Sequence, residues 1–233
     1  MTDKKYAKSV VLLSGGLDSS IALHVAKRES EEVYALSIRY GQQHEKELAC
    51  ARWQANSAGV AAHHEVELLL SSWGGSSLTD SRISIEHGDV HRLETPNTYV
   101  PARNMVFVSV AASLAEAVGA TAIYLGVSEA DYSGYVDCRS DFIAAMEKAV
   151  NAGTERKSTG GALIHLETPF LHMRKADEIR LALAMGVELQ HTWTCYFGGE
   201  TPCGECDSCM LRARAFEEVG VADPLVKNSR CQK

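Results

Sequence analysis

The chain has 233 residues, of which 45% are hydrophobic and 23% are charged, and its formal net charge is −7 at pH 7. This length and composition are typical of one globular α/β domain with a small appendage, and they exclude a disordered chain. The acidic balance argues against broad binding to nucleic acid phosphates, and the longest apolar stretch, 105–118, is shorter than the roughly 20 residues that cross a bilayer.

Short runs rich in Val, Ile and Leu alternate with segments that carry Ala, Leu, Glu and Lys at three- and four-residue spacings. This alternation predicts an α/β fold with a doubly wound, mostly parallel, Rossmann-like sheet. The expected strands are 10–13, 33–38, 63–66, 122–125 and 163–166. The expected helices are 19–27, 45–58, 104–118, 140–150, 175–185 and 209–219. Glycine and serine interrupt this rhythm at 71–99 and 152–162, where we expect long connections.

The first expected strand runs directly into the motif Ser-Gly-Gly-Leu-Asp-Ser-Ser at 14–20, and a helical pattern follows it. Two glycines allow positive φ angles, and the N–H groups at a helix start bind oxyanions, so this loop suits polyphosphate. It lacks the Gly-Lys-Ser/Thr ending of a Walker A motif. Asp18 stands in the loop instead, where a carboxylate would help to hold Mg²⁺ among phosphates. The alternative is a tight turn in which Asp18 or Ser19 caps the helix.

Four of the seven cysteines form the pattern Cys-x7-Cys-x2-Cys-x2-Cys in the C-terminal fifth of the chain. Short gaps let thiolates converge on one ion, and four soft thiolates favour tetrahedral, structural Zn²⁺. An iron–sulfur cluster and disulfides are the alternatives. The expected ligands are Cys195, Cys203, Cys206 and Cys209. We therefore expect two parts, a nucleotide- and substrate-binding domain at 1–190 and a small helical zinc-binding subdomain at 191–233.

The other cysteines and the N-terminal residues carry weaker signals. Cys50 lies in an Ala-rich helical segment and is most simply a small buried residue, whereas a redox or nucleophilic role stays open for Cys138. The residues before the first expected strand contain no apolar signal region. We expect a cytoplasmic protein, in which clustered cysteines favour metal over disulfides.

Two polar strings, 96–104 and 126–139, adjoin expected hydrophobic elements at the sheet edge where open parallel sheets bind ligands. Arg103 is suited to grip a carboxylate or phosphate, and Asn104 to cap the helix that it opens. The second string offers carboxylates for an amino-purine-like edge or Mg²⁺, and rings for stacking. These candidates are Glu129, Asp131, Tyr132, Tyr135 and Asp137. A solvated loop is the alternative.

The loop at 14–20 resembles the pyrophosphate-binding loop of the ATP pyrophosphatases, which have the adenine nucleotide α-hydrolase type of fold. Taken with the strings Asn-Thr-Tyr-Val-Pro-Ala-Arg-Asn and Tyr-Ser-Gly-Tyr-Val-Asp-Cys-Arg and with the cysteine pattern, the chain resembles the 7-cyano-7-deazaguanine synthases from about Val10 to Pro224. The resemblance implies that 7-carboxy-7-deazaguanine, ammonia and ATP with Mg²⁺ are the substrates. It also implies structural Zn²⁺ at the four cysteines, a homodimer and a place on the route to queuosine in tRNA, without direct nucleic acid or membrane partners.

The resemblance further implies roles for individual residues. The ATP-binding residues would be Leu13, Ser14, Gly15, Gly16, Leu17, Asp18, Ser19, Ser20, Ile21, Ala22 and Leu23. The catalytic residues would be Asp18, Ser19, Arg103 and Lys175. The substrate-binding residues would be Arg103, Glu129, Asp131, Tyr135, Asp137 and Arg139. For Lys175, a surface position at a helix start is the alternative.

Two departures and two alternative activities accompany this resemblance. Ala102 stands where family members commonly carry Gly, so we expect a negative φ there. The connection at 152–162 is a few residues longer than expected. A relative that stops at the amide, or joins the acid to another amine, is one alternative. An ATP-dependent tRNA sulfur-transfer enzyme is the other, and the acidic balance counts against it.

Overall fold

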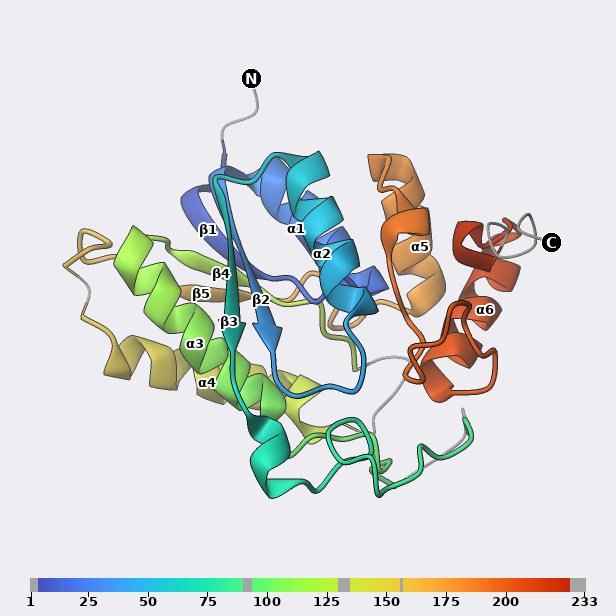
Figure 1. Ribbon diagram of the computed structural model, residues 1–233. Helices are drawn as coiled ribbons and strands as arrows, with labels where there is room; N and C mark the ends of the chain where they lie inside the picture. Colours follow the sequence, from blue (N-terminus) through green and yellow to red (C-terminus); the bar gives the residue numbers. More distant parts are fainter. Residues whose placement is uncertain (1–3, 90–93, 130–134, 156, 227–233) are drawn as a thin grey trace.

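A parallel sheet forms the centre of the protein. The computed structural model describes residues 4–89, 94–129, 135–155 and 157–226 (Figure 1). Within these residues five strands pair in the order β3-β2-β1-β4-β5, and every pairing is parallel. The strands are β1 (Tyr6–Leu12), β2 (Ser30–Arg39), β3 (Ala62–Glu67), β4 (Ala122–Tyr124) and β5 (His165–Glu167).

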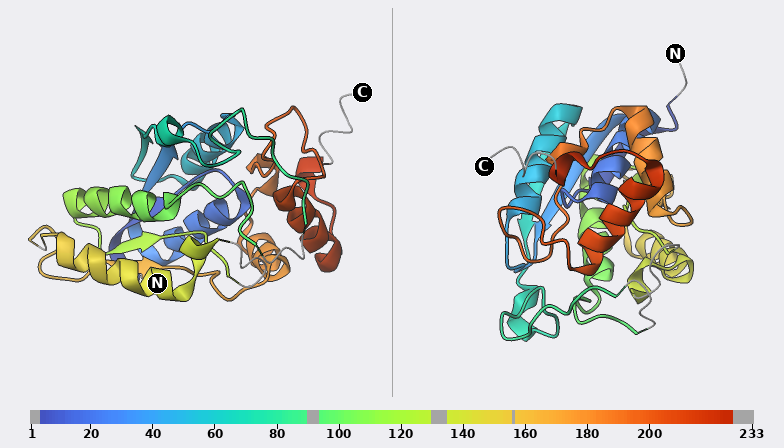
Figure 2. Two further views of the ribbon diagram at one scale, coloured as in Figure 1. Left: turned by 90° about the horizontal axis from the view of Figure 1, so that it is seen from below. Right: turned by 90° about the vertical axis from the view of Figure 1, so that its right-hand side faces the viewer.

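Helices cover both faces of the sheet, which confirms the predicted doubly wound α/β class. The α-helices are α1 (Leu17–Glu29), α2 (Lys46–Ala58), α3 (Arg103–Val118), α4 (Ser140–Gly153), α5 (Lys175–Met185) and α6 (Asp207–Val219). Side chains from one face of the strands, such as Val10 and Ile123, pack against α3 and α4. Those from the other face, such as Val11 and Ala35, pack against α1 and α2. Helices α5 and α6 lie side by side beyond α1 (Figure 2).

The predicted elements agree with the observed ones to within a few residues. The largest shifts are at the first strand, which begins at Tyr6, at the second strand, which begins at Ser30, and at α4, which ends at Gly153. The last helix begins at Asp207 because Cys206 is its N-cap. None of the described helices is long and apolar enough to span a membrane. The placement of these elements follows from the alternation of hydrophobic strands with amphipathic helices, which the sequence shows directly.

The connection between β3 and α3 joins distant parts of the fold. It opens with a short 3₁₀ helix, η1 (Leu70–Trp73), and its described residues then run toward the C-terminal part of the chain. There Gly88 N–H donates to Glu205 O (2.9 Å) and Asp89 N–H donates to Asp207 Oδ1 (2.6 Å). These bonds attach the connection to the start of α6, next to the cysteines.

The start of α3 corrects two expectations. Ala102, the residue before the helix, has φ = +53°, so the expected negative φ is wrong. Ala102 N–H donates to Tyr99 Oη (3.1 Å), which supports this left-handed turn. Asn104 does not cap α3, because it lies inside the first helical turn and its side chain bonds to Asp137 and Cys138 instead.

Replacing Ala102 with glycine is expected to stabilise the protein by about 0.5 kcal/mol. The left-handed conformation costs an L-residue about 1 kcal/mol, and the extra freedom of glycine in the unfolded chain offsets about half of the gain. The free energy of unfolding in urea measures this effect. Ala117→Gly, at an exposed position within α3, is the control and should destabilise by about 1 kcal/mol. A destabilised Ala102→Gly variant would contradict the assigned strain.

Candidate active site

A cavity of about 320 Å³ opens at the carboxyl ends of β1, β2 and β4. This is the edge at which open parallel sheets bind ligands, and the strand order reverses between β1 and β4. The volume lies in the range of small-molecule sites. Residues from the loop at 14–20, the first turns of α2, α3 and α5, and the C-terminal part of the chain all line it.

The loop at 14–20 gathers backbone N–H groups at the start of α1. Ser14 N–H and Gly15 N–H donate to Ser19 Oγ (3.2 Å each), and Gly16 N–H donates to Ser14 Oγ (3.1 Å). Gly15 has φ = +88°, and a Cβ atom there would lie 1.9 Å from Glu47 O. Only glycine fits this position. The converging N–H groups and the helix N-terminus form an arrangement that binds phosphate.

Lys175 lies between two carboxylates beside this loop. Its Nζ is 2.7 Å from Asp18 Oδ1 and 3.1 Å from Glu178 Oε1. Burial opposes the charge of Lys175, but the two carboxylates outweigh it and raise its pKa. Burial, and then the charge of Asp18, raise the pKa of Glu178, which is fully buried. The surface alternative for Lys175 is therefore wrong.

Arg103, at the start of α3, brings a positive charge to the cavity lining. Its guanidinium lies 5.7 Å from the ring centre of Tyr40 and 5.9 Å from that of Phe107. Within the described residues it forms no ion pair, so its charge is available to a carboxylate or phosphate.

Asp137 positions the start of α3 and does not line the cavity. Its Oδ2 accepts from Asn104 N–H (3.0 Å), and its carbonyl oxygen accepts from Asn104 Nδ2 (3.0 Å). The carboxylate, only 5% exposed, thus satisfies an otherwise unpaired N–H of the first turn. Asp137 therefore orients the turn that carries Arg103, and direct contact of Asp137 with a substrate stays a prediction.

Of the other expected substrate-binding residues, one lines the cavity, two lie outside its lining, and one lies outside the described residues. Tyr135 lines the cavity, and its Oη lies 2.8 Å from Thr98 Oγ1. Glu129 lies outside the lining, where it pairs with His172 Nδ1 (2.9 Å) and accepts from Ser140 N–H at the start of α4. Arg139, the exposed residue that precedes α4, is also outside the lining. Asp131 and Tyr132 lie outside the described residues.

Burial disfavours the thiolate form of two further cysteines, Cys138 and Cys50. Cys138 lines the cavity, and burial raises its pKa to about 12, which opposes a nucleophilic role. Cys50 is partly buried against the cysteine cluster, and burial raises its pKa to about 11. The described structure therefore favours a packing role for both thiols.

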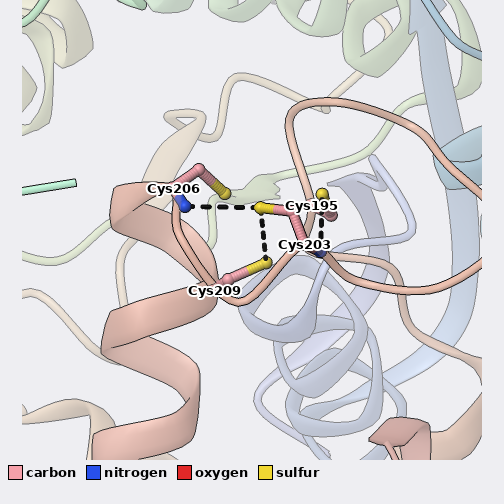
Figure 3. Close-up of side chains that lie close together, drawn as sticks. All are labelled: Cys195, Cys203, Cys206 and Cys209. Carbon is pink, nitrogen blue, oxygen red and sulfur yellow. Dashed lines mark hydrogen bonds between the residues drawn. The ribbon is translucent and has the colours of Figure 1, made fainter. Parts of the chain in front are cut away.

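The four C-terminal cysteines converge on one point (Figure 3). Their sulfur atoms all lie within 4.8 Å of one another, and Cys203 Sγ is 3.9 Å from Cys209 Sγ. A tetrahedral ion with metal–sulfur bonds of about 2.3 Å would place sulfurs about 3.8 Å apart, so this set fits a metal ion. The N–H groups of Glu205 and Cys206 donate to Cys203 Sγ (3.3 Å each) and orient that ligand.

The segment that carries the cysteine cluster contributes residues to the cavity lining. Trp193 N–H donates to Gly15 O (3.0 Å) in the phosphate loop, while Trp193 Nε1 donates to Cys195 O (2.9 Å). The neighbouring residues Thr194, Tyr196 and Asp207 line the cavity. The cysteine cluster and the loop at 14–20 are thus joined by one short segment of chain.

The family model described as "Queuosine biosynthesis protein QueC" matches residues 8–220. The chain belongs to this family. It is similar to the 7-cyano-7-deazaguanine synthase of Clostridium kluyveri, with 50% identity over 94% of this chain and 96% of that protein. The synthase of Trichodesmium erythraeum is 48% identical over 94% of this chain and 100% of that protein. These comparisons confirm the family and the class of enzyme that the motifs predicted.

A solved structure of a 4-thiouridine synthetase in complex with RNA and ATP is similar in fold to this QueC-family chain. The TM-score is 0.52 and the identity 18%, and the match covers 92% of this chain and 50% of that one. At this identity the likeness shows the shared fold alone.

Several residues that build the site of this QueC-family chain escaped the sequence reasoning. Glu178 directly follows Asp177, an acid typical of a helix surface, and Arg212 lies in a helix rich in charged residues. Neither residue therefore has a sequence context that predicts burial or a role in the site. Yet Arg212 is 4% exposed, and its Nε and Nη2 atoms lie 2.7 and 2.9 Å from the carboxylate of Asp223. Arg212 also donates to Thr192 and Thr194, which fixes the segment before Cys195. Glu47, in the first turn of α2, is the third missed residue.

Gly126 was also missed, and its replacement by alanine is expected to lower turnover of ATP about 100-fold. A Cβ atom there would lie 2.7 Å from Asp18 C and Ser19 N, so the phosphate loop would have to move. A displacement of about 1 Å in a catalytic group costs on the order of 100-fold. AMP release measures the loss. Gly153→Ala is the matched control, because nothing lies within 4 Å of its Cβ position. Full activity in Gly126→Ala would show that the loop tolerates the shift.

Proposed function

We propose that this chain is an ATP-dependent ligase that converts 7-carboxy-7-deazaguanine and ammonia to 7-cyano-7-deazaguanine. The names of its relatives support this activity. The observation that carries it is the cavity that joins the phosphate loop, the Asp18–Lys175 pair and Arg103. These are the groups needed to bind a triphosphate and an acid together and to offset the charge that develops between them.

The proposed reaction uses the cavity twice. In the first round the acid oxygen attacks the α-phosphate of ATP, pyrophosphate leaves, and ammonia displaces AMP to give the amide. In the second round the amide oxygen is adenylated, and AMP leaves as the nitrile forms. Both rounds activate an oxygen on the same carbon, so one site can serve both.

The loop and its neighbours would hold the phosphates through this sequence. The N–H groups in the first turn of α1, which have no partner within the helix, would donate to pyrophosphate oxygens, and Lys175 would neutralise them from the side. Arg103, from the start of α3, would orient the carboxylate or the α-phosphate. Mg²⁺ supplies charge neutralisation on the phosphates when it is bound, and Asp18 is the lining carboxylate placed to hold it.

We propose that the ion at the four cysteines is Zn²⁺ and that it is structural. All four donors are thiolates, which leaves no open position for substrate. Elemental analysis of purified protein should find one zinc ion per chain. Iron and sulfide with visible absorption would favour the iron–sulfur alternative.

The activity is tested by incubation with ATP, Mg²⁺, ammonium and 7-carboxy-7-deazaguanine, followed by product mass and AMP counts. Nitrile with two AMP per product is the expected result. Amide with one AMP would instead support the relative that stops after one round, and no AMP would contradict both activities. The homodimer and the cytoplasmic location stay predictions, and sedimentation analysis tests the first of them.

A further inference from the structure

Glu47 occupies a place in the cavity that its sequence context does not suggest. It lies in the first turn of α2, and this turn packs directly on the phosphate loop. The contact is so close that Gly15 has no room for a side chain beside Glu47 O. Glu47 lines the same cavity as Asp18 and Arg103, and the charge of Arg103 acts on its carboxylate.

The other carboxylates of the cavity already have partners. Among the described lining residues the acids are Asp18, Glu47 and Asp207. Asp18 is paired with Lys175, and Asp207 accepts from Asp89 N–H (2.6 Å) at the start of α6. The carboxylate of Glu47 has no hydrogen-bond or ion-pair partner in the described part of the chain, so it is free to act on a ligand.

The proton affinity of the Glu47 carboxylate is suited to proton transfer from a substrate at neutral pH. Burial raises the pKa of its carboxyl group to about 7, although the charge of Arg103 lowers it. A base works best when its pKa is near the working pH, because enough of it is ionised and it still attracts protons. Glu47 is therefore a carboxylate that can bind a cation and accept its proton.

We propose that Glu47 is the catalytic base that binds ammonium and removes protons from the reacting nitrogen. This inference rests on the proposed function, and it names the residue that removes protons from the nitrogen substrate of that reaction. In the first round the Glu47 carboxylate takes a proton from ammonium, and the lone pair of ammonia attacks the acyl carbon. The C–O bond to AMP then breaks, and the new nitrogen loses one more proton to give the amide.

The second round also requires a base that removes protons from the nitrogen. After adenylation of the amide oxygen, the nitrogen carries two protons. Both leave as the C–O bond to AMP breaks and the electron pairs form the carbon–nitrogen triple bond. Glu47 accepts these protons in turn and passes them to solvent through the cavity mouth. No oxidant or reductant is needed, so the step balances with the proposed substrates alone.

The test separates adenylation from nitrogen transfer in Glu47→Gln, which keeps the size of the side chain. Exchange of labelled pyrophosphate into ATP with the acid, without ammonia, should stay within about twofold of the wild-type rate. Amide formation from ammonia in a single turnover should fall about 100-fold or more. Hydroxylamine is a weaker base than ammonia, is largely uncharged at neutral pH and needs no prior deprotonation. With hydroxylamine in place of ammonia, the variant should therefore keep most of the wild-type rate.

Two further variants keep the test decisive. Glu45→Gln removes a neighbouring exposed carboxylate, which pairs with Arg39 (3.2 Å) outside the cavity, and should change neither half of the reaction. Glu47→Asp keeps the carboxylate and should recover part of the ammonia-dependent rate, which also guards against a folding defect in Glu47→Gln.

Several outcomes would overturn the role of Glu47. These are a wild-type response to ammonia in Glu47→Gln, an equal loss with ammonia and hydroxylamine, or a loss of pyrophosphate exchange as large as the loss of amide formation. If the wild-type protein itself shows no acid-dependent exchange, the proposed function fails, and that result is distinct from the other three.

Discussion

Replacement of Cys206 with serine is expected to remove the bound metal and to lower the free energy of unfolding by more than about 4 kcal/mol. Cys206 is fully buried, and its sulfur lies among those of Cys195, Cys203 and Cys209. A metal ion that is bound only in the folded state contributes its binding free energy to folding. The loss of one of the four ligands is therefore expected to destabilise the whole C-terminal part of the chain.

The effect should reach the nucleotide loop as well. Trp193 connects the cysteine cluster to the loop, because its N–H donates to Gly15 O and its Nε1 donates to Cys195 O. A disordered metal site would free this segment, so we expect weaker ATP binding together with lower stability. Elemental analysis, urea unfolding and ATP titration measure the three effects.

A matched variant separates metal loss from the loss of a sulfur atom. Cys50→Ser changes a partly buried thiol that packs against the cluster but is not one of its ligands, so it should keep the metal. Removal of the ion from wild-type protein with a chelator should reproduce the behaviour of Cys206→Ser. A Cys206→Ser protein with full metal content and normal unfolding would rule out the structural role.

The fold was predictable because each element carries its own pattern. The strands are short apolar runs, the helices have apolar positions at three- and four-residue spacings, and the loop at 14–20 follows β1 without a break. Local signals of this kind need no knowledge of distant contacts. The cysteine cluster was predictable for the same reason, since only two residues separate neighbouring members of the group Cys203, Cys206 and Cys209.

The cavity wall was less predictable because distant contacts decide which loop residues face it. Asp137 and Glu129 have the chemistry of ligands, yet Asp137 bonds to Asn104, thirty-three positions away, and Glu129 bonds to α4 and His172. Glu47 has the sequence context of a surface acid at a helix start, where acids are favoured by the helix dipole. Only the packing of α2 on Gly15 turns it toward the cavity.

Asp18→Asn is expected to reduce AMP formation at least about 100-fold while the protein stays folded. The amide has the shape of the carboxylate but lacks its charge, so it would no longer hold a cation beside the phosphates. Lys175 would keep its contact with Glu178 at 3.1 Å, and loss of the Asp18 charge removes one of the causes that raise the pKa of Glu178, so the ammonium would still have a partner. For that reason the loss should appear in turnover and in the Mg²⁺ dependence rather than in the melting temperature.

A control on α5 makes this interpretation specific. Asp177 is a half-exposed acid that lies between Lys175 and Glu178 in the sequence of α5. It pairs with Arg180 at 2.6 Å and is absent from the cavity lining, so Asp177→Asn should retain wild-type turnover. Equal activity of Asp18→Asn and Asp177→Asn would remove Asp18 from the mechanism. If high Mg²⁺ restores most of the activity of Asp18→Asn but not of a Lys175→Met variant, the two side chains have separate tasks. Asp18 then acts through the metal ion, and Lys175 acts on the phosphates directly, which is the division that their shared position at the loop implies.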